Sequence, residues 1–298
     1  MPAIRRRRPK NNESGAVSSL IAYVNGSFVP LDQAYVHVED RGFQFADSVY
    51  EVIACYGGVF LDLPAHLRRL QASCTAIAMS MPCPADKLAE LIGETCRRNP
   101  FRNASVYVQV TRGTAPRALR IPDAIRPTLV ITCRGLPFPP EQAPEYSAIT
   151  LRDFRWERCD IKTTALLASV MGRQEAVRRG AEEGFWTDTD GHVLEGAATN
   201  VLAIIDGALV THPLDRHVLG GITREMALRQ ASHAGIRVEE RPWRLAEPKL
   251  SECMMTSTLY ALAPVCRVDG QDIGNGHPGP LTLNLRRAMI AQFRSMGA

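Results

Sequence analysis

A proline-rich segment near the middle of the chain limits what the chain can fold into. Residues 135–146 read GLPFPPEQAPEY and hold four prolines in twelve positions. Proline lacks a backbone N–H and disfavours helical geometry in the residue before it, so no regular helix or strand is expected here. We therefore predict an interdomain linker at 135–146, between an N-terminal domain at 21–134 and a C-terminal domain at 147–298. Two modest domains also suit a length of 298 residues.

Charge separates the first 20 residues from the rest of the chain. Arg5 to Arg8 and Lys10 give this stretch five positive charges, against the single negative charge of Glu13. The net charge of the whole chain is +4, so the remainder is neutral. We interpret residues 1–20 as a basic arm without regular structure; an arm that contacts phosphates is the alternative. The neutral remainder argues against a nucleic-acid-binding face on the fold.

Composition and apolar patterning exclude further classes of protein. Apolar residues make up 45% of the chain and charged residues 22%, as in ordinary globular proteins. No apolar run approaches the roughly 18 residues of a membrane span, and no apolar stretch follows the basic residues as in a secretory signal. The eight cysteines include no CxxC pair, so neither a disulfide framework nor a zinc site is indicated. We predict a cytoplasmic protein with no membrane partner and no metal.

The pattern of elements predicts an α+β fold with mixed sheets. Runs rich in β-branched and aromatic residues predict short strands at 21–29 and 35–40, broken by Asn25-Gly26, and further strands at 104–113, 127–135, 147–154, 184–188, 200–205 and near Met254-Met255. A hairpin is predicted over 48–63 around Gly57-Gly58. Helical spacing of apolar residues predicts helices through Leu67–Ile77, Lys87–Ile92 and Leu166–Met171, after Gly220-Gly221 and over 281–293. Helices grouped between runs of strands favour α+β over a doubly wound parallel fold.

Lysine usage indicates one candidate catalytic residue. Only four of the 35 basic residues are lysine: Lys10, Lys87, Lys162 and Lys249. Arginine does not lose its proton in a protein, so a lysine among so many arginines marks either surface drift or a need for a deprotonable amine. Lys162 lies between a predicted strand and an apolar helix, where burial would lower the pKa of its amine and let it form a Schiff base. A lysine with its stem on apolar surface and its amine in water is the alternative.

Two further segments suit an anion. Gly220-Gly221-Ile222-Thr223 leads from a glycine turn into a predicted helix, whose free N–H groups lie at the positive end of the helix dipole. Met255-Thr256-Ser257-Thr258 offers three hydroxyls near a predicted strand end. An ordinary turn and cap, or a surface turn, is the alternative for each segment. No HExxH, GxSxG, Walker or GxGxxG sequence is present.

Seven ordered segments carry a family resemblance: EDRGFQFADSVYEV, HLRRL, VYVQVTRGTAPRA, RWERCDIK, LEGAATNV, GGITR and TSTLYALAPV. With them, the chain from about residue 21 onward resembles the fold-type IV pyridoxal-phosphate enzymes, and among these the D-amino acid aminotransferases. The resemblance implies a two-domain α+β fold, pyridoxal 5'-phosphate as cofactor and amino transfer from a D-alanine-like D-amino acid to a 2-oxo acid such as 2-oxoglutarate. Branched-chain aminotransferases, (R)-amine transaminases and aminodeoxychorismate lyases are the alternatives within the family.

The resemblance also implies site residues. Lys162 matches the Schiff-base lysine that moves the substrate proton, and Glu195 matches the carboxylate that keeps the cofactor ring nitrogen protonated. Leu219 matches the apolar residue that packs on the ring. The residues that match the phosphate-binding set are Arg69, Ile222, Thr223, Ser257 and Thr258.

The match is incomplete on the substrate side. Tyr50 and Arg117 match two residues that hold the substrate α-carboxylate, but Leu119 stands where the third, a histidine, is expected. The resemblance implies a homodimer whose loops complete the neighbouring site, so Arg120 or the other subunit are candidates for the missing contact. Further departures from the family pattern are Ala54, in place of a lysine, and Ala197-Ala198-Thr199, in place of a serine-rich run.

Overall fold

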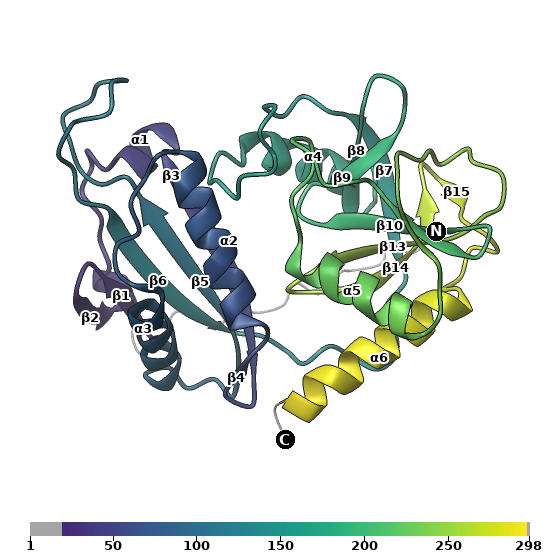
Figure 1. The fold of residues 1–298 in the computed structure, drawn as a ribbon, viewed down its shortest axis with the longest axis horizontal. Coiled ribbons are helices and arrows are strands. Elements are labelled where there is room, and N and C mark those ends of the chain that lie inside the picture. Colours follow the sequence, from purple (N-terminus) through teal and green to yellow (C-terminus); the bar gives the residue numbers. More distant parts are fainter. Residues whose placement is uncertain (1–19, 297–298) are drawn as a thin grey trace, which may run out of the picture.

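The structure, a computed structural model of the chain, describes residues 20–296. The predicted basic arm therefore lies outside the described residues, apart from Leu20. Two sheets, each with its own helices, lie side by side and are joined by the proline-rich segment (Figure 1). Residues 136–145 form no helix or strand, as predicted. Both sheets combine with helices in the manner of an α+β protein, which confirms the predicted fold class.

The first sheet is antiparallel throughout and has the strand order β2-β1-β6-β5-β3-β4. Its tight turns are the predicted glycine turns, since Gly26, Gly57 and Gly58 all have positive φ. Helices α2 and α3 bury an apolar face against it. Its elements are β1 (Ile21–Val24), β2 (Ser27–Pro30), α1 (Arg41–Phe45), β3 (Ser48–Tyr56), β4 (Val59–Phe60), α2 (Leu63–Ala76), α3 (Ala85–Arg97), β5 (Asn103–Thr111) and β6 (Thr128–Gly135).

The strand predicted at 35–40 is wrong. Residues 34–39 form a loop that follows a short 3-10 helix, Leu31–Gln33, and the side chains of Tyr35, Val36 and Val38 are exposed. Their alternation suits a strand, but no strand within residues 20–296 pairs with Tyr35, Val36 or Val38. The segment ends at Asp40, which caps α1 by accepting a hydrogen bond from the Gly42 amide at 2.8 Å.

The second sheet is mixed. Its order is β12-β11-β10-β13-β14-β7-β8-β9, with β15 paired to β14, and β7 runs parallel to both β8 and β14. Five of its strands, β9, β11, β12, β14 and β15, were not predicted from the sequence. Strands β9 and β11 are buried at every position and so lack the alternation that marks a half-exposed strand. The strands are β7 (Tyr146–Arg152), β8 (Glu183–Thr187), β9 (Val193–Gly196), β10 (Asn200–Ile205), β11 (Ala208–Thr211), β12 (Val238–Glu240), β13 (Leu250–Ser257), β14 (Ala261–Val268) and β15 (Gln271–Asp272).

Three helices accompany this second sheet: α4 (Leu167–Arg178), α5 (Ile222–His233) and α6 (Pro280–Met296). Helices α5 and α6 pack on one face of the sheet, and their apolar cluster also takes in Ala54, Tyr56 and Leu61 from the first sheet. The two sheets thus share a core at this junction. Within residues 20–296, no helix is long and apolar enough to cross a membrane.

Candidate active site

A cavity of about 420 Å³ lies between the two sheets. Its wall combines β3 and α2 of the first part with the loop before α4, strand β9, the start of α5 and the end of β13. Such a volume suits a cofactor or a small substrate. Nine of the ten predicted site residues line it: Tyr50, Arg69, Lys162, Glu195, Leu219, Ile222, Thr223, Ser257 and Thr258.

Lys162 lies in the loop between β7 and α4, where its backbone is fixed from both sides. Its carbonyl accepts a hydrogen bond from the Tyr50 amide at 3.0 Å, and its amide donates to Ser73 Oγ at 3.3 Å. The Lys162 amine lies 4.3 Å from the centroid of the Tyr50 ring. Burial, helped by the positive charge of Arg69, lowers the pKa of Lys162 to about 8. The other two described lysines are exposed at the surface, as predicted.

Glu195 lies on β9 and directs its carboxylate into the cavity wall. One oxygen pairs with the Arg155 guanidinium, and the other accepts hydrogen bonds from the Leu219 amide at 2.9 Å and the Asn200 amide side chain at 3.1 Å. Burial raises the pKa of Glu195, while Arg155 and the Leu219 N–H oppose that rise. The carboxylate is therefore held in one orientation by three donors.

Arg155 is a site residue that the sequence analysis missed. Asp153 holds its guanidinium in two bonds, Nε to Oδ1 at 3.0 Å and Nη2 to Oδ2 at 2.8 Å, and Nη2 also donates to the His217 carbonyl at 3.0 Å. The side chain is only 9% exposed. In the sequence, Arg155 is marked only by its place in the segment RWERCDIK. That segment does not reveal the contact of Arg155 with Glu195, which is 40 positions away.

The start of α5 offers an anion site. Gly221 caps this helix without a side-chain hydrogen bond, so the first N–H groups of the helix face the cavity near Ile222 and Thr223. A Cβ atom on Gly221 would lie 1.9 Å from Asn200 Oδ1, so only glycine fits this close approach. The Asn200 amide also donates to the Leu219 carbonyl at 2.7 Å.

Arg69 and a group of hydroxyls complete this anion site. Arg69 Nη1 donates to the Gly220 carbonyl at 2.8 Å, at the turn that leads into α5. The hydroxyls of Ser257 and Thr258 line the same cavity. Thr256 also lines the cavity, and its buried Oγ1 has no hydrogen-bond partner among the described residues. A helix N-terminus, an arginine and hydroxyls together suit a phosphate dianion.

Arg69 is itself held by a buried acid that the sequence analysis did not find. Glu51 is fully buried and accepts hydrogen bonds from Arg69 Nε at 2.7 Å and Nη2 at 2.8 Å. His66 Nδ1 lies 2.7 Å from the second Glu51 oxygen. Burial alone would raise the pKa of Glu51, but the bonds from Arg69 and His66 outweigh it and bring the pKa to about 2.

Of the two residues predicted to bind the substrate carboxylate, only Tyr50 lies in the cavity. Tyr50 lines the cavity, and burial raises its pKa to about 12, so its hydroxyl stays protonated. Arg117 is exposed and lies outside the cavity of its own chain, with its guanidinium 4.8 Å from the centroid of the Phe45 ring. The loop that carries Arg117 is fixed against α1, because Arg41 donates to the Ala118 carbonyl at 2.6 Å. Leu119, in the same loop, is 84% exposed.

The alanines that depart from the family pattern also lie in different places. Ala54 is fully buried in the apolar cluster shared by the two sheets, away from the cavity. Ala197 and Ala198 line the cavity itself, as does Thr199. Only the second departure therefore alters the chemistry of the cavity wall.

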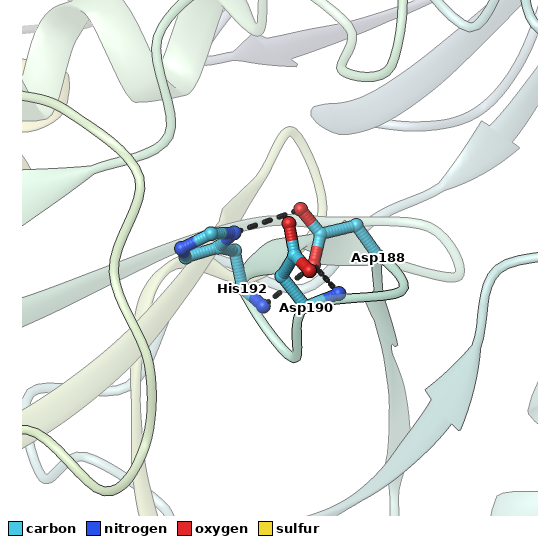
Figure 2. Close-up of side chains that lie close together, drawn as sticks. All are labelled: Asp188, Asp190 and His192. Atoms are coloured by element: carbon cyan, nitrogen blue, oxygen red, sulfur yellow. Dashed lines mark hydrogen bonds and ion pairs between the residues drawn. The ribbon is translucent and has the colours of Figure 1, made fainter.

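A second group of polar residues lies outside the cavity. Asp188, Asp190 and His192 gather in the turn between β8 and β9 (Figure 2). Asp188 accepts hydrogen bonds from the amides of Asp190 at 2.9 Å and His192 at 2.8 Å, and its other oxygen lies 2.8 Å from His192 Nδ1. These hydrogen bonds stabilise the turn and explain why the three side chains lie close together.

The cavity residues fit pyridoxal 5'-phosphate. Lys162 supplies an amine of lowered pKa for an aldehyde, Glu195 a carboxylate for a ring nitrogen, and the start of α5 with Arg69 a set of donors for a phosphate. The unpartnered Thr256 hydroxyl gives an independent sign that a polar ligand belongs in the wall.

Comparison with known proteins identifies the family. Residues 48–268 match the family described as amino-transferase class IV. The D-alanine aminotransferase of Bacillus licheniformis is 37% identical over 267 residues, covering 89% of this chain and 94% of that protein. The D-alanine aminotransferase of Staphylococcus haemolyticus is 33% identical, covering 92% and 98%.

Solved structures show the same fold. The branched-chain amino acid aminotransferase of Escherichia coli superposes with a TM-score of 0.85 at 26% identity, covering 92% of this chain and 95% of that one. The branched-chain aminotransferase of Thermoproteus uzoniensis gives 0.84 at 23% identity, covering 93% and 96%. The chain belongs to the class IV aminotransferases.

Proposed function

We propose that the protein is a pyridoxal-phosphate-dependent aminotransferase that moves the amino group of a D-alanine-like D-amino acid to a 2-oxo acid such as 2-oxoglutarate. The observation that carries the proposal is a single cavity that Lys162, Glu195 and the start of α5 all line. The names of the relatives support D-alanine as the donor. The branched-chain structures support only the shared fold.

Each residue has a defined task in this reaction. The cofactor, when bound, draws electrons from the substrate carbon that loses its proton. Lys162 would hold the cofactor through its amine and would carry the proton from that carbon, for which an amine with a pKa of about 8 is well suited. Glu195 keeps the ring nitrogen protonated, and Arg155 fixes the orientation of Glu195. The cofactor phosphate would be bound by Arg69, Ile222, Thr223, Ser257 and Thr258, and Leu219 would contact the ring.

Incubation of the holoenzyme with D-alanine and 2-oxoglutarate tests the reaction. Formation of pyruvate and glutamate in equal amounts supports amino transfer. Turnover of L-leucine or of an (R)-amine, with D-alanine inert, would select a branched-chain or amine transaminase instead. Pyruvate released from aminodeoxychorismate without an amino acceptor would select the lyase.

The protein acts as a homodimer in which each subunit completes the site of the other. Six apolar side chains on α4 and in the loop before it are exposed in the single chain: Phe154, Trp156, Leu166, Leu167, Val170 and Met171. Such a patch at the mouth of a cavity supports a covering subunit. Arg117 is exposed outside its own cavity, which supports a contact with the substrate carboxylate in the partner's site. The cytoplasm remains the proposed location.

Subunit mixing tests this arrangement. Lys162→Ala and Arg117→Ala homodimers should each transfer amino groups poorly. After the two variants are unfolded and refolded together, mixed dimers contain one site with both residues intact if Arg117 acts across the interface, and activity returns. If Arg117 acts in its own subunit, no mixed site is intact and activity stays low. Val170→Glu, measured by sedimentation, should shift the protein toward monomer.

A further inference from the structure

One arginine of the cavity has no task in the reaction described so far. Arg173 lies on α4, where Leu166, Ser169 and Arg173, spaced by three and four residues, all line the cavity. Leu167, Val170 and Met171 on the same helix are exposed. Arg173 therefore lies on the face of α4 that lines the cavity.

The guanidinium of Arg173 is held at two points and remains accessible. Nη1 lies 3.2 Å from Glu183 Oε2, and Nη2 donates to the Tyr260 hydroxyl at 3.2 Å. A guanidinium has five N–H groups, so these contacts leave Nε and one N–H on each terminal nitrogen. The Arg173 side chain is 35% exposed, against 15% for Arg69 and 9% for Arg155. Both of those arginines already donate to acids and carbonyls within the wall.

Glu183 divides its hydrogen bonds among several donors. Its carboxylate is fully buried and also accepts hydrogen bonds from the Gly184 amide at 3.0 Å and from Thr199 Oγ1 at 3.2 Å. Burial raises the pKa of Glu183, while Arg173, Gly184 and Thr199 oppose that rise. Glu183 therefore anchors one terminal nitrogen of Arg173, and the N–H groups left over are available to a ligand in the cavity.

We propose that Arg173 binds the distal carboxylate of a dicarboxylic substrate such as 2-oxoglutarate and so favours dicarboxylic over uncharged 2-oxo acids; this inference rests on the proposed aminotransferase function. Tyr50 lies on β3 and Arg173 on α4, and both line the one cavity, so a substrate whose α-carboxylate lies near Tyr50 can place its distal carboxylate on Arg173. Tyr260 positions the guanidinium. A guanidinium prefers a carboxylate to a neutral side chain because it can donate two parallel hydrogen bonds.

Acceptor specificity tests the proposal. Arg173→Gln should lower kcat/KM for 2-oxoglutarate by about 10- to 100-fold, the loss expected for hydrogen bonds to a charged group. The value for 2-oxohexanoate, an uncharged acceptor, should stay within about 3-fold. Arg178→Gln is the matched control, because Arg178 lies on the same helix with its side chain 75% exposed, and it should change neither value. An equal loss with both acceptors would show a structural or α-carboxylate role and overturn the proposal.

A binding measurement separates this inference from the reaction itself. Calorimetric titration of the wild-type holoenzyme with glutarate and with pentanoate requires no turnover. Glutarate should bind more tightly, and Arg173→Gln should remove the preference; equal binding of the two acids by the wild type would overturn the proposal even if amino transfer is observed. Inactivity toward every D-amino acid, with the glutarate preference intact, would instead refute only the proposed function. Should Arg173→Gln fail to fold, Tyr260→Phe should lower the same preference by about 3- to 10-fold.

Discussion

Both carboxylate oxygens of Glu51 accept hydrogen bonds from Arg69, at 2.7 Å from Nε and 2.8 Å from Nη2. The pair joins β3 to α2, and the remaining Nη1 of Arg69 donates to the carbonyl of Gly220 in the second part of the chain. Glu51, which is buried in the first sheet, thereby positions Arg69 beside the N-terminus of α5, a helix of the second sheet. Removal of Glu51 should loosen both the fold and the anion site.

The Glu51 carboxyl should make stability depend on acid pH. Its pKa of about 2 lies below the ordinary value of 4.5, so its contribution is complete above about pH 4.5 and is lost as the pH falls toward 2. The shift corresponds to about 3 kcal/mol in the free energy of unfolding. Urea unfolding of Glu51→Gln should show a shallower decline between pH 4.5 and 2 than the wild type. Parallel declines would mean that other carboxyls dominate.

Lys162 should carry the cofactor. Borohydride reduction of the holoenzyme, followed by digestion and mass spectrometry, should recover the cofactor on the peptide that contains Lys162 and on no other. Lys162→Ala should abolish the adduct, whereas Lys87→Arg and Lys249→Arg should leave it unchanged, since both lysines are exposed and paired with Glu90 and Asp206. An adduct on either of those residues would refute the assignment.

The pH dependence of cofactor uptake should report the amine of Lys162. Only a neutral amine attacks an aldehyde, and burial lowers the pKa of Lys162 from its ordinary 10.5 to about 8. The rate of the absorbance change after cofactor is added to the apoprotein should rise with pH through about 8 and then level off. A lysine peptide, measured in parallel, should continue to rise toward 10.5. A protein profile that follows the peptide would show an unburied amine.

Glu195→Gln should separate cofactor binding from turnover. The neutral amide still fills the space beside Arg155 and Asn200, so the cofactor should remain bound. The amide no longer stabilises a protonated ring nitrogen, so kcat should fall by roughly 100-fold or more, as when one electrostatic contact to a transition state is removed. Glu182→Gln, at an exposed position next to the buried Glu183, serves as the control. Unchanged kcat in Glu195→Gln would mean that another group protonates the ring.

Thr256→Val should affect the apoprotein and the holoenzyme in opposite directions. The buried Thr256 hydroxyl has no partner among residues 20–296, so its replacement by a methyl group should leave the unfolding free energy of the apoprotein equal or higher by about 1 kcal/mol. The dissociation constant of the cofactor should rise by about 5- to 10-fold. Thr282→Val is the contrast, because Thr282 donates to Glu252 at 2.6 Å and its loss should destabilise the apoprotein. A destabilised Thr256→Val apoprotein would show an internal role for the hydroxyl.

Two signals in the sequence led to residues that line the cavity. Lysine scarcity in the whole chain pointed to Lys162, and the local glycine turn before Thr223 predicted a helix start that lies in the same wall. Arg155 and Glu51 were missed because their importance depends on partners 40 and 18 positions away.

One expectation failed for a related reason, and one residue could not be placed from the sequence. The strand at 35–40 has the right alternation, but pairing with another strand is a tertiary property that no local pattern contains. The position of Arg117 in the sequence likewise could not show that its loop packs on Phe45, outside the cavity of its own chain.

The close approach of Gly221 to Asn200 has a consequence for how such an enzyme can evolve. Asn200 bonds to Glu195 and to the Leu219 carbonyl, and its other amide atom lies where a side chain on Gly221 would begin. A mutation at either position therefore disturbs the Glu195 carboxylate and the start of α5 together. Lineages that descend from this protein should inherit Gly221 and Asn200 as a linked pair, while the substrate wall around Arg173 and Ala198 remains free to diversify.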